Sequence, residues 1–328
     1  MSKNTRTNNQ SNENDQGPEP KFFNNNQERN ITNIEQSIQS ILEKVSIKRL
    51  RQYLNTLSDF HTRHSKSPIL NDAGDYIMNE LRGLGYGDTS FHSFRATIDN
   101  EIFELRNIVC KKKGIDEKLI MVCAHYDCIM NRKEDSFSRA PGANDNGSGV
   151  SAIIEIARIL ANENLRHSVQ FVFFSGEEQG LLGSKSYAKY IKESGMDLYR
   201  LINLDMIGYP FFAPNTVIIE RDNNTDVKHN HVKKNDTESI EFGEMMKDMT
   251  SAVGLQFHLN TIYDSDYESF EAKGYVVIGA YDGSADPIKN PHYHSSSDLP
   301  ENIDWDYLTS VTKLVLATVL KIDSINSY

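Results

Sequence analysis

The sequence predicts an α/β protein in which a mixed, mostly parallel sheet lies between two layers of helices. Short apolar runs predict six strands, and several of these runs are apolar on both faces, as strands covered by helices on both sides are. Segments with helical spacing alternate with the runs, which is typical of parallel strands joined by helices. Together these observations predict a three-layer α/β/α sandwich.

Apolar residues at helical spacing predict helices, of which the first lie within 34–58 and 71–87. Asn71 is the expected N-cap of the second, and three glycines mark its end. Further helices are expected near 147–163, 183–194, 237–253 and 304–322. Runs rich in β-branched and aromatic residues predict the strands. These runs lie at 105–112, 118–127, 168–176, 200–208, 215–220 and 275–281.

Two polar segments interrupt this pattern. Residues 1–32 are rich in Asn, Gln, Glu and Ser and contain little that could be buried, so we expect a disordered tail. The remaining residues, 33–328, are long enough to bury a sizeable core and are expected to form a single domain. Within it, the polar stretch 221–236 is expected to be a long surface loop. Its His229 and His231 could bind a metal, but we expect them to be mobile and solvated.

Composition excludes several classes of function. The chain carries 46 acidic and 35 basic residues, a net charge of −11, and has no basic stripe that could follow a phosphate backbone, so no nucleic-acid partner is expected. No segment predicts a membrane span or a signal peptide, and we expect a cytoplasmic protein with no membrane partner. Cys110, Cys123 and Cys128 lack the spacing of a disulfide framework or a zinc knuckle and are expected to be buried thiols.

Polar side chains follow three of the predicted strands at the point where each strand ends. His125 and Asp127 end the run "KLIMVCAHYD". Glu177 and Glu178 follow "SVQFVFFSG", and Asp205 follows "RLINL". In an open α/β sheet, ligands bind just beyond the carboxyl ends of the strands. We therefore expect these side chains to meet at one rim of the sheet.

Two loops supply further candidates. "PGANDNGSG" places Asp145 directly before a helix, and "NPHYHSSSD" supplies His292, His294 and Asp298. Each residue alone also has a structural interpretation, with Asp145 and Asp298 as helix caps and His125 as a buried core histidine. Two histidines and several carboxylates at one rim nevertheless suit zinc. One carboxylate that bridges would suit a pair of ions about 3.5 to 4 Å apart.

A family resemblance adds to this interpretation. The motifs "AHYD", "PGANDNGSG", "FSGEEQGLLGS", "NLDMIG" and "YHSSSD", in this order, resemble those of the di-zinc aminopeptidases of clan MH, typified by bacterial leucyl aminopeptidase. "DFHTRHSKS" and "SDYESFEAKGY" also look like that family, and the resemblance covers about 36–322. It implies the zinc-dependent exopeptidase fold, which is phosphorylase/hydrolase-like, for one catalytic domain at 33–328. It also implies an aminopeptidase that uses two Zn²⁺ ions to hydrolyse the first bond of peptides with a free N-terminus.

The resemblance implies a role for each candidate residue. Asp145 would bridge the two zinc ions, and its bond to Asn146 would be cis. Glu177 would be the general base. Asp127 would accept a hydrogen bond from the second ring nitrogen of His125, the one that does not bind zinc. The remaining ligands would each bind one ion only, with His125 and Asp205 on one zinc and Glu178 and His294 on the other.

The sequence departs from the family at two positions and leaves alternatives open. Tyr267 stands where relatives often carry His, and Asn144 where many carry a second Asp, but no ligand position is lost. A glutaminyl cyclase with one zinc ion is the first alternative, although such enzymes tend to read "DGEE" and to have Trp at the position of Tyr293. A carboxypeptidase and a non-catalytic binding module on the same scaffold are the others. Side-chain preference and oligomeric state are left open. Candidate walls of the substrate pocket are Tyr209, Phe211, Phe212, Tyr263, Tyr267 and Phe270.

Overall fold

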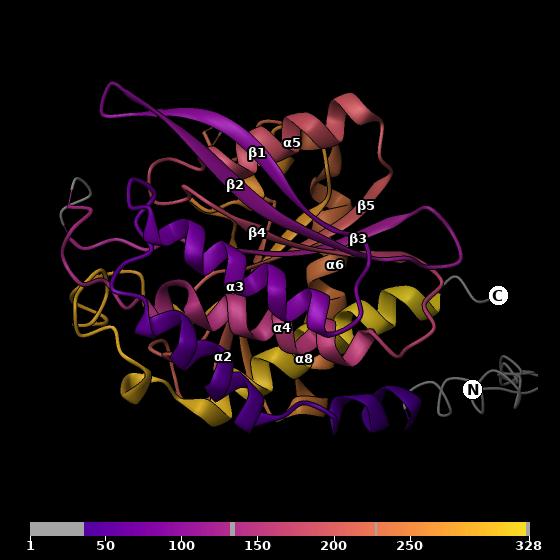
Figure 1. Ribbon diagram of the computed structural model, residues 1–328. Helices are drawn as coiled ribbons and strands as arrows, with labels where there is room; N and C mark the ends of the chain where they lie inside the picture. Colours follow the sequence, from indigo (N-terminus) through magenta and orange to yellow (C-terminus); the bar gives the residue numbers. More distant parts are fainter. Residues whose placement is uncertain (1–35, 132–134, 227, 326–328) are drawn as a thin grey trace, which may run out of the picture. The chain divides into compact units, whose positions relative to one another are not determined.

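The computed structural model describes residues 36–131, 135–226 and 228–325, and Figure 1 shows the arrangement of their helices and strands. The described residues from Ile38 onward form one compact unit. The tail expected at 1–32 lies outside the described residues, so its disorder and its boundary stay predictions.

An eight-stranded mixed sheet runs through this unit in the order β1-β2-β4-β3-β5-β8-β6-β7. The four central strands, β4, β3, β5 and β8, are parallel to one another. Antiparallel pairs join β1 to β2, β2 to β4 and β8 to β6, and β7 is parallel to β6. The strands are β1 (Thr89–Ile98), β2 (Glu101–Lys112), β3 (Leu119–His125), β4 (Ser168–Phe174), β5 (Leu198–Leu204), β6 (Thr216–Arg221), β7 (Gln256–Thr261) and β8 (Val277–Tyr281).

Helices cover both faces of the sheet, which confirms the predicted three-layer sandwich. On one face α4 packs against β3 and β4, and α2, α3 and α8 pack against α4 (Figure 1). On the other face α5 and α7 pack against each other and against the sheet. No helix among the described residues has the length and apolarity needed to cross a bilayer. The helices are α2 (Ile47–Asp59), α3 (Ile69–Gly83), α4 (Gly149–Leu160), α5 (Leu182–Ser194), α6 (Asp236–Met249), α7 (Tyr267–Glu271) and α8 (Trp305–Ile325).

The hydrophobic pattern explains which strands are central. Every residue of β3 and of β4 is buried, as their continuous apolar runs predict for strands between two helix layers. β1 and β7 lie at the edges of the sheet and are mostly exposed or half-buried, so they lack the apolar run on which strand prediction depends. The sequence therefore predicts the six inner strands and misses both edge strands.

Two local expectations are settled by the structure. The three cysteines are free and buried, as predicted. Asn71 is not an N-cap, because α3 already begins at Ile69, directly after Pro68. Proline suits the start of a helix, since its missing N–H would have no partner there.

The prediction that both histidines of the loop are solvated is wrong for His229, whereas His231 is exposed but paired. His229 is buried, and its Nδ1 pairs with the carboxylate of Glu268 on α7. His231 is half exposed, and its Nδ1 lies 2.6 Å from Glu271 Oε2 on the same helix. Both carboxylates are distant in sequence, so a reading of the loop by itself does not find them.

Gly149 lets the start of α4 approach the end of β5 closely. A Cβ atom at this position would lie 2.5 Å from Asn146 Oδ1 and 2.9 Å from the carbonyl oxygen of Leu204. Real Cβ atoms do not approach other atoms so closely, so any side chain at this position would move the loop away from the strand end.

We therefore expect Gly149→Ala to lower the free energy of unfolding by about 1 to 3 kcal/mol, the usual cost of an overpacked site. Gly83→Ala is the matched control, because nothing lies within 4 Å of its added methyl group. That change should be neutral or stabilising by about 0.5 to 1 kcal/mol, since alanine restricts the unfolded chain. Urea unfolding of both variants measures the difference, and equal stabilities would contradict the packing argument.

Candidate metal centre

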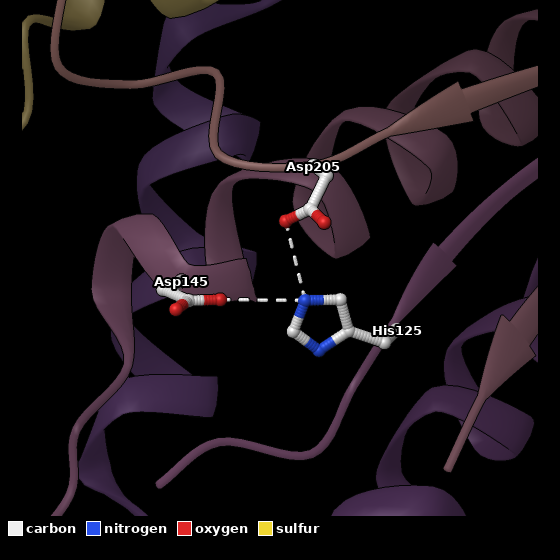
Figure 2. A group of neighbouring side chains, drawn as sticks. All are labelled: His125, Asp145 and Asp205. Carbon is white, nitrogen blue, oxygen red and sulfur yellow. Dashed lines mark hydrogen bonds and ion pairs between the residues drawn. The ribbon is translucent and has the colours of Figure 1, made fainter. Parts of the chain in front are cut away.

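Three strand ends and two loops meet at one rim of the sheet, as the sequence predicts. His125 is the last residue of β3, the two glutamates follow β4 by three and four residues, and Asp205 directly follows β5. Since these strands are neighbours and parallel, their carboxyl ends lie at the same edge. Figure 2 shows His125, Asp145 and Asp205 turned toward one another.

The loop before α4 holds Asp145 in a non-helical conformation. The cis bond expected between Asp145 and Asn146 is present. The carboxylate of Asp298 accepts the backbone N–H of Asn144 at 2.9 Å and that of Asp145 at 3.0 Å. On the other side, Asn146 Nδ2 donates to the carbonyl oxygen of Leu204 at 2.9 Å. These bonds fix the Asp145 backbone to the end of β5, so Asp298 supports the loop and caps no helix.

The candidate ligands form two groups that share Asp145. In the first, His125 Nε2 lies 3.3 Å from Asp145 Oδ1 and 3.3 Å from Asp205 Oδ1. In the second, His294 Nε2 lies 3.0 Å from Asp145 Oδ2 and 3.2 Å from Glu178 Oε1. Each oxygen of Asp145 therefore faces a different histidine, which is the arrangement a bridging carboxylate needs. The ligand atoms of each group lie within 4.8 Å of one another.

The second group contains atoms that need a partner. His294 Nε2 and Glu178 Oε1 are buried, and neither makes a hydrogen bond to any described residue. Buried polar atoms are almost always paired, so two orphaned atoms that face each other at 3.2 Å need an explanation. Because a cation between them would satisfy both, and one imidazole with two carboxylates is a usual zinc ligand set, the residues fit a metal ion.

A hydrogen bond assigns the tautomer of His125. Its Nδ1 lies 3.1 Å from the backbone carbonyl oxygen of Asp127, which can only accept, so Nδ1 carries the proton. Nε2 is then the ring atom that faces Asp145 and Asp205, and a metal ion would take the place of its proton there. The resemblance had implied the Asp127 carboxylate as this partner, but its Oδ1 lies 3.7 Å from Nδ1.

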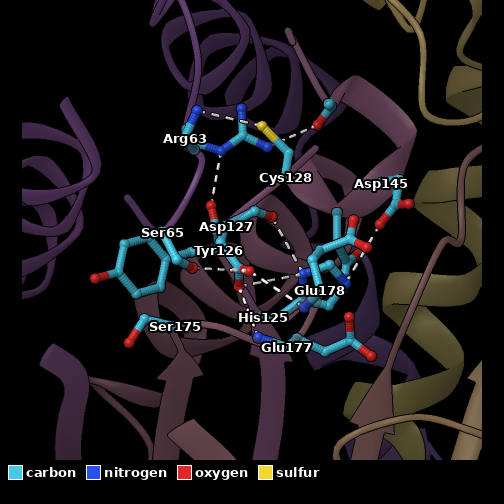
Figure 3. A network of polar contacts seen from close by, with 12 residues as sticks. Arg63, Ser65, His125, Tyr126, Asp127, Cys128, Asp145, Ser175, Glu177 and Glu178 are labelled. Carbon is cyan, nitrogen blue, oxygen red and sulfur yellow. Dashed lines mark hydrogen bonds and ion pairs between the residues drawn. The ribbon is translucent and has the colours of Figure 1, made fainter. Parts of the chain in front are cut away.

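The Asp127 carboxylate instead organises the turn after β4. Its Oδ1 accepts the backbone N–H of Glu177 at 3.2 Å and its Oδ2 that of Glu178 at 3.3 Å (Figure 3). The Ser65 hydroxyl donates to Oδ2 from the other side. One side chain thus ties the ends of β3 and β4 together and sets the positions of the two adjacent glutamates.

The electrostatics of the rim require positive charge. Burial raises the pKa of Glu178 to about 7, and the Asp145 carboxylate adds to this shift. Burial disfavours the charged form of His294, but the carboxylates of Glu178 and Asp145 outweigh that effect and raise its pKa to about 10. Without a cation, protons must therefore balance these carboxylates. A divalent cation can replace the protons, because it supplies the same charge at the same place.

Glu177 belongs to neither ligand group, although it lines the same cavity. Burial raises the pKa of its carboxyl group well above the usual range, with the imidazole of His125 opposing the shift and the neighbouring carboxylates of Glu178 and Asp205 adding to it. A carboxyl group that is raised in pKa, beside a candidate metal site and not itself a ligand is a candidate for proton transfer.

His292, and Asn144 at a position where many relatives carry Asp, make contacts that stabilise the loops around the site. His292 Nδ1 pairs with the hydroxyl of Ser297 at 2.9 Å and joins neither ligand group. Asn144 donates from Nδ2 to Asp282 Oδ2 at 3.0 Å and accepts the backbone N–H of Gly208 at 2.8 Å. An aspartate in place of Asn144 could accept but could not donate to Asp282, so the amide suits this position.

Arg63 is a residue of this region that sequence reasoning missed. It is fully buried, and its guanidinium group donates to backbone carbonyl oxygens of three segments. Figure 3 shows the bond to Tyr126. Arg63 lies in "DFHTRHSKS", a motif to which the sequence assigned no role. The acceptors are Tyr126 at 2.8 Å, Leu57 at 2.9 Å, Pro141 at 2.6 Å and Gly142 at 2.8 Å.

A cavity of about 460 Å³ opens beside the ligand groups. Tyr263 and Tyr267 line it, as expected, whereas Phe270 packs in the core instead. The predicted walls Tyr209, Phe211 and Phe212 are not among its lining residues. Four candidate ligands line the cavity, together with Glu177 and Met206. The other lining residues are Glu220, Asn260, Tyr263, Asp264, Ser265, Tyr267, Tyr281, Ala285, Lys289 and Tyr293.

An α/β sheet with buried imidazoles and carboxylates at the carboxyl ends of its parallel strands defines a metal-dependent hydrolase. The model of the family described as "Peptidase family M28" matches residues 107–319. The chain belongs to this family and is a metallopeptidase.

Curated relatives agree with this assignment, and solved structures share the fold. A "Probable leucine aminopeptidase" of Trichophyton verrucosum is 26% identical over 289 residues, which cover 85% of this chain and 74% of the relative. A "Probable zinc metalloprotease" of Pyricularia oryzae is 26% identical over 331 aligned positions, covering 85% and 65%. Among solved structures, the LapA aminopeptidase of Legionella pneumophila has a TM-score of 0.72 at 21% identity, covering 88% and 75%. A glutaminyl cyclase of Porphyromonas gingivalis has a TM-score of 0.70 at 20% identity, covering 85% and 99%.

We expect Arg63→Met to lower the free energy of unfolding by about 3 kcal/mol or more, because four buried carbonyl groups lose a charged donor. Arg63→Lys should restore little, since an ammonium group cannot reach carbonyls in three directions. Arg95→Met is the control, because Arg95 is 77% exposed and its pair with Glu104 lies on the surface. Chemical denaturation should leave the control within about 0.5 kcal/mol of the parent, and a similar effect for both would contradict the assignment.

Removal of metal should destabilise the protein, since the rim then loses its compensating charge. We expect a chelator to lower the melting temperature and added zinc to restore it, with a stabilisation of about 2.7 kcal/mol when free zinc is 100 times its dissociation constant. Asp145→Asn should abolish most of this response, because Asp145 belongs to both groups. A melting temperature that is indifferent to chelator and zinc would contradict metal binding at this rim.

Proposed function

We propose that the chain is a zinc-dependent aminopeptidase that hydrolyses the N-terminal peptide bond of peptides at a site for two zinc ions. The observation that carries this proposal is the shared position of Asp145, whose two oxygens face two separate imidazole and carboxylate groups. Membership of peptidase family M28 and the names of the relatives support zinc and an aminopeptidase reaction.

Five residues would hold the ions. His125 and Asp205 would bind one, Glu178 and His294 the other, and Asp145 both. When bound, such ions lower the pKa of a water molecule to about 7 and polarise a substrate carbonyl group. Three ligand carboxylates would balance three of the four positive charges, and Glu177, which lines the same cavity, would supply a fourth negative charge when ionised.

Glu177 would move the proton of the reaction. Its carboxylate takes a proton from the attacking water, and the resulting carboxyl group donates that proton to the nitrogen of the leaving amine as the peptide bond breaks. Burial raises its pKa, which strengthens it as a proton acceptor compared with an ordinary carboxylate. The hydrogen bond from its backbone N–H to Asp127 fixes its position relative to His125.

The acidic lining would favour the substrate's charged amino group. With the ligand carboxylates and Glu177 balanced by the ions, the charged side chains that remain among the described lining residues are two acids, Glu220 and Asp264, and one base, Lys289. A free N-terminus near the ions would gain from this charge, whereas the C-terminal carboxylate that a carboxypeptidase must bind would be repelled. The cavity charge therefore favours an aminopeptidase over a carboxypeptidase.

Glutaminyl cyclase is the second candidate, because a structure of that enzyme shares the fold over 85% of this chain. The two reactions differ in what the site must hold, since the cyclase alternative implies one zinc ion. The metal-to-protein ratio of the purified protein, measured together with turnover of leucine arylamide and of a peptide with N-terminal glutamine, separates them. Two ions with arylamide turnover support the proposal, and one ion with cyclisation overturns it.

The adjacent glutamates should respond differently to the same substitution. Glu177→Gln should keep both ions and lose about 100-fold to 10,000-fold or more in kcat, because the general base is gone. Glu178→Gln should lose metal, since a neutral amide is a much weaker ligand. Metal analysis and single-turnover rates on leucine arylamide measure both effects. A Glu177→Gln enzyme with near-native turnover would contradict the assignment of Glu177 as the general base.

A further inference from the structure

The cavity beside the metal centre contains a carboxylate that the proposed reaction does not use. Glu220, near the end of β6, lines the cavity and is 6% exposed. The hydroxyl of Tyr267 donates to its Oε2 at 2.8 Å. Among the described residues, no lysine, arginine or histidine forms an ion pair with Glu220, and none donates a hydrogen bond to its Oε1. A buried acid without a cationic partner is costly, so its presence beside a substrate cavity calls for a partner.

The sheet is built to make room for this carboxylate. Glu220 lies opposite Gly279 of β8, and Gly279 lies opposite Asn203 of β5. A Cβ atom at Gly279 would lie 2.6 Å from Tyr267 Cε1 and 2.7 Å from Glu220 Oε2. Only glycine therefore leaves space for the ring of Tyr267 over β8 and for its contact with Glu220. The arrangement is thus held by β6, β8 and α7 together.

The position of Glu220 suits a substrate side chain and not the metals. Glu220 belongs to neither ligand group, and β8 separates its strand from β5, after which the ligand Asp205 follows. The partly exposed rings of Tyr263 and Tyr281 line the same cavity. Tyrosine faces attract cations and cover alkyl chains. A long side chain with a terminal positive charge, in contact with these rings, would match such a wall and the carboxylate beside it.

We propose that Glu220 binds the cationic side chain of the substrate's first residue, so that the enzyme prefers N-terminal arginine or lysine. This inference rests on the proposed aminopeptidase function. The enzyme would then discriminate between substrates by their first residue, because a basic side chain can donate a charged hydrogen bond to the Glu220 carboxylate and an apolar one cannot. Leucine or methionine in the cavity would bury the carboxylate without a partner.

The charges around Glu220 agree with this assignment. Burial raises its pKa to about 8, the Tyr267 hydroxyl opposes that shift, and the carboxylates of Asp205 and Glu268 add to it. The remaining charges of the cavity wall, Asp264 and Lys289, are exposed and of opposite sign. A substrate cation is bound best by ionised Glu220, and ionisation increases as the pH rises through about 8. The preference for arginine over leucine should therefore be larger at pH 8.5 than at pH 6.5.

A panel of aminoacyl arylamides tests the proposal on the zinc-loaded full chain at pH 8.5. The unmodified enzyme should have a higher kcat/KM for the arginine and lysine derivatives than for the leucine and methionine derivatives. Glu220→Gln should lower the arginine-to-leucine ratio by about 10-fold to 100-fold, through a lower arginine value and a leucine value that is unchanged or raised, because the carboxylate that leucine would bury is gone. Asp264→Asn is the control, because it removes an exposed carboxylate of the same cavity wall, and it should change the ratio less than threefold or so.

The possible outcomes are distinct. A parent enzyme that prefers leucine, or a Glu220→Gln variant that loses the same factor with every substrate, would overturn the proposal, the second because Glu220 would then hold the common amino group. If metal binds but no arylamide is hydrolysed, the proposed function fails. Calorimetric binding of L-argininamide and L-leucinamide then still tests Glu220, since argininamide should bind more tightly to the parent and lose that advantage in Glu220→Gln. Equal binding of the two amides would overturn the inference by itself.

Discussion

The architecture of the site depends on one carboxylate that faces two imidazoles at once. Asp145 reaches His125 with one oxygen and His294 with the other, at 3.3 and 3.0 Å. This requires a backbone that is fixed from several sides, because a loop free to move would choose one partner. Asp298 binds the two N–H groups at Asn144 and Asp145, and Arg63 binds the carbonyl groups that precede them. Much of the buried polar structure around the loop thus serves the position of a single side chain.

Glu177 and Glu178 are adjacent in sequence but differ in the chemical roles that their side chains can take. Both follow β4, and both backbone N–H groups bind the same Asp127 carboxylate, so their positions are set together. Their side chains nevertheless diverge, since Glu178 reaches His294 and Glu177 stays outside both ligand groups. Under the proposed function, bound metal removes the repulsion between them, and one glutamate is left free to carry a proton.

The cavity wall contains a further buried carboxylate, Glu220, which we assign to the substrate. Glu220 is held by Tyr267 in a space that Gly279 leaves open, and it has no cationic partner within the described chain. Tyr267 thereby gains a role that its place in "SDYESF" did not predict, because its ring and hydroxyl position a wall residue and do not face the ligands. Specificity in this protein would then follow from the one buried acid of the wall that the ions do not neutralise.

The sequence by itself determined the sheet's inner strands, the longer helices that cover them and the rim at which the polar residues collect, but not the short helix α7. It could do so because continuous apolar runs mark buried strands, and because the carboxyl ends of parallel strands share one edge. The tertiary structure alone decided which atoms meet. The Asp127 backbone, rather than its carboxylate, orients His125, while His229 and His231 pair with acids of α7. Arg63 and Glu220 act through residues far away in the chain. Such contacts depend on distances of a few ångströms between distant segments, and no local pattern of residues encodes them.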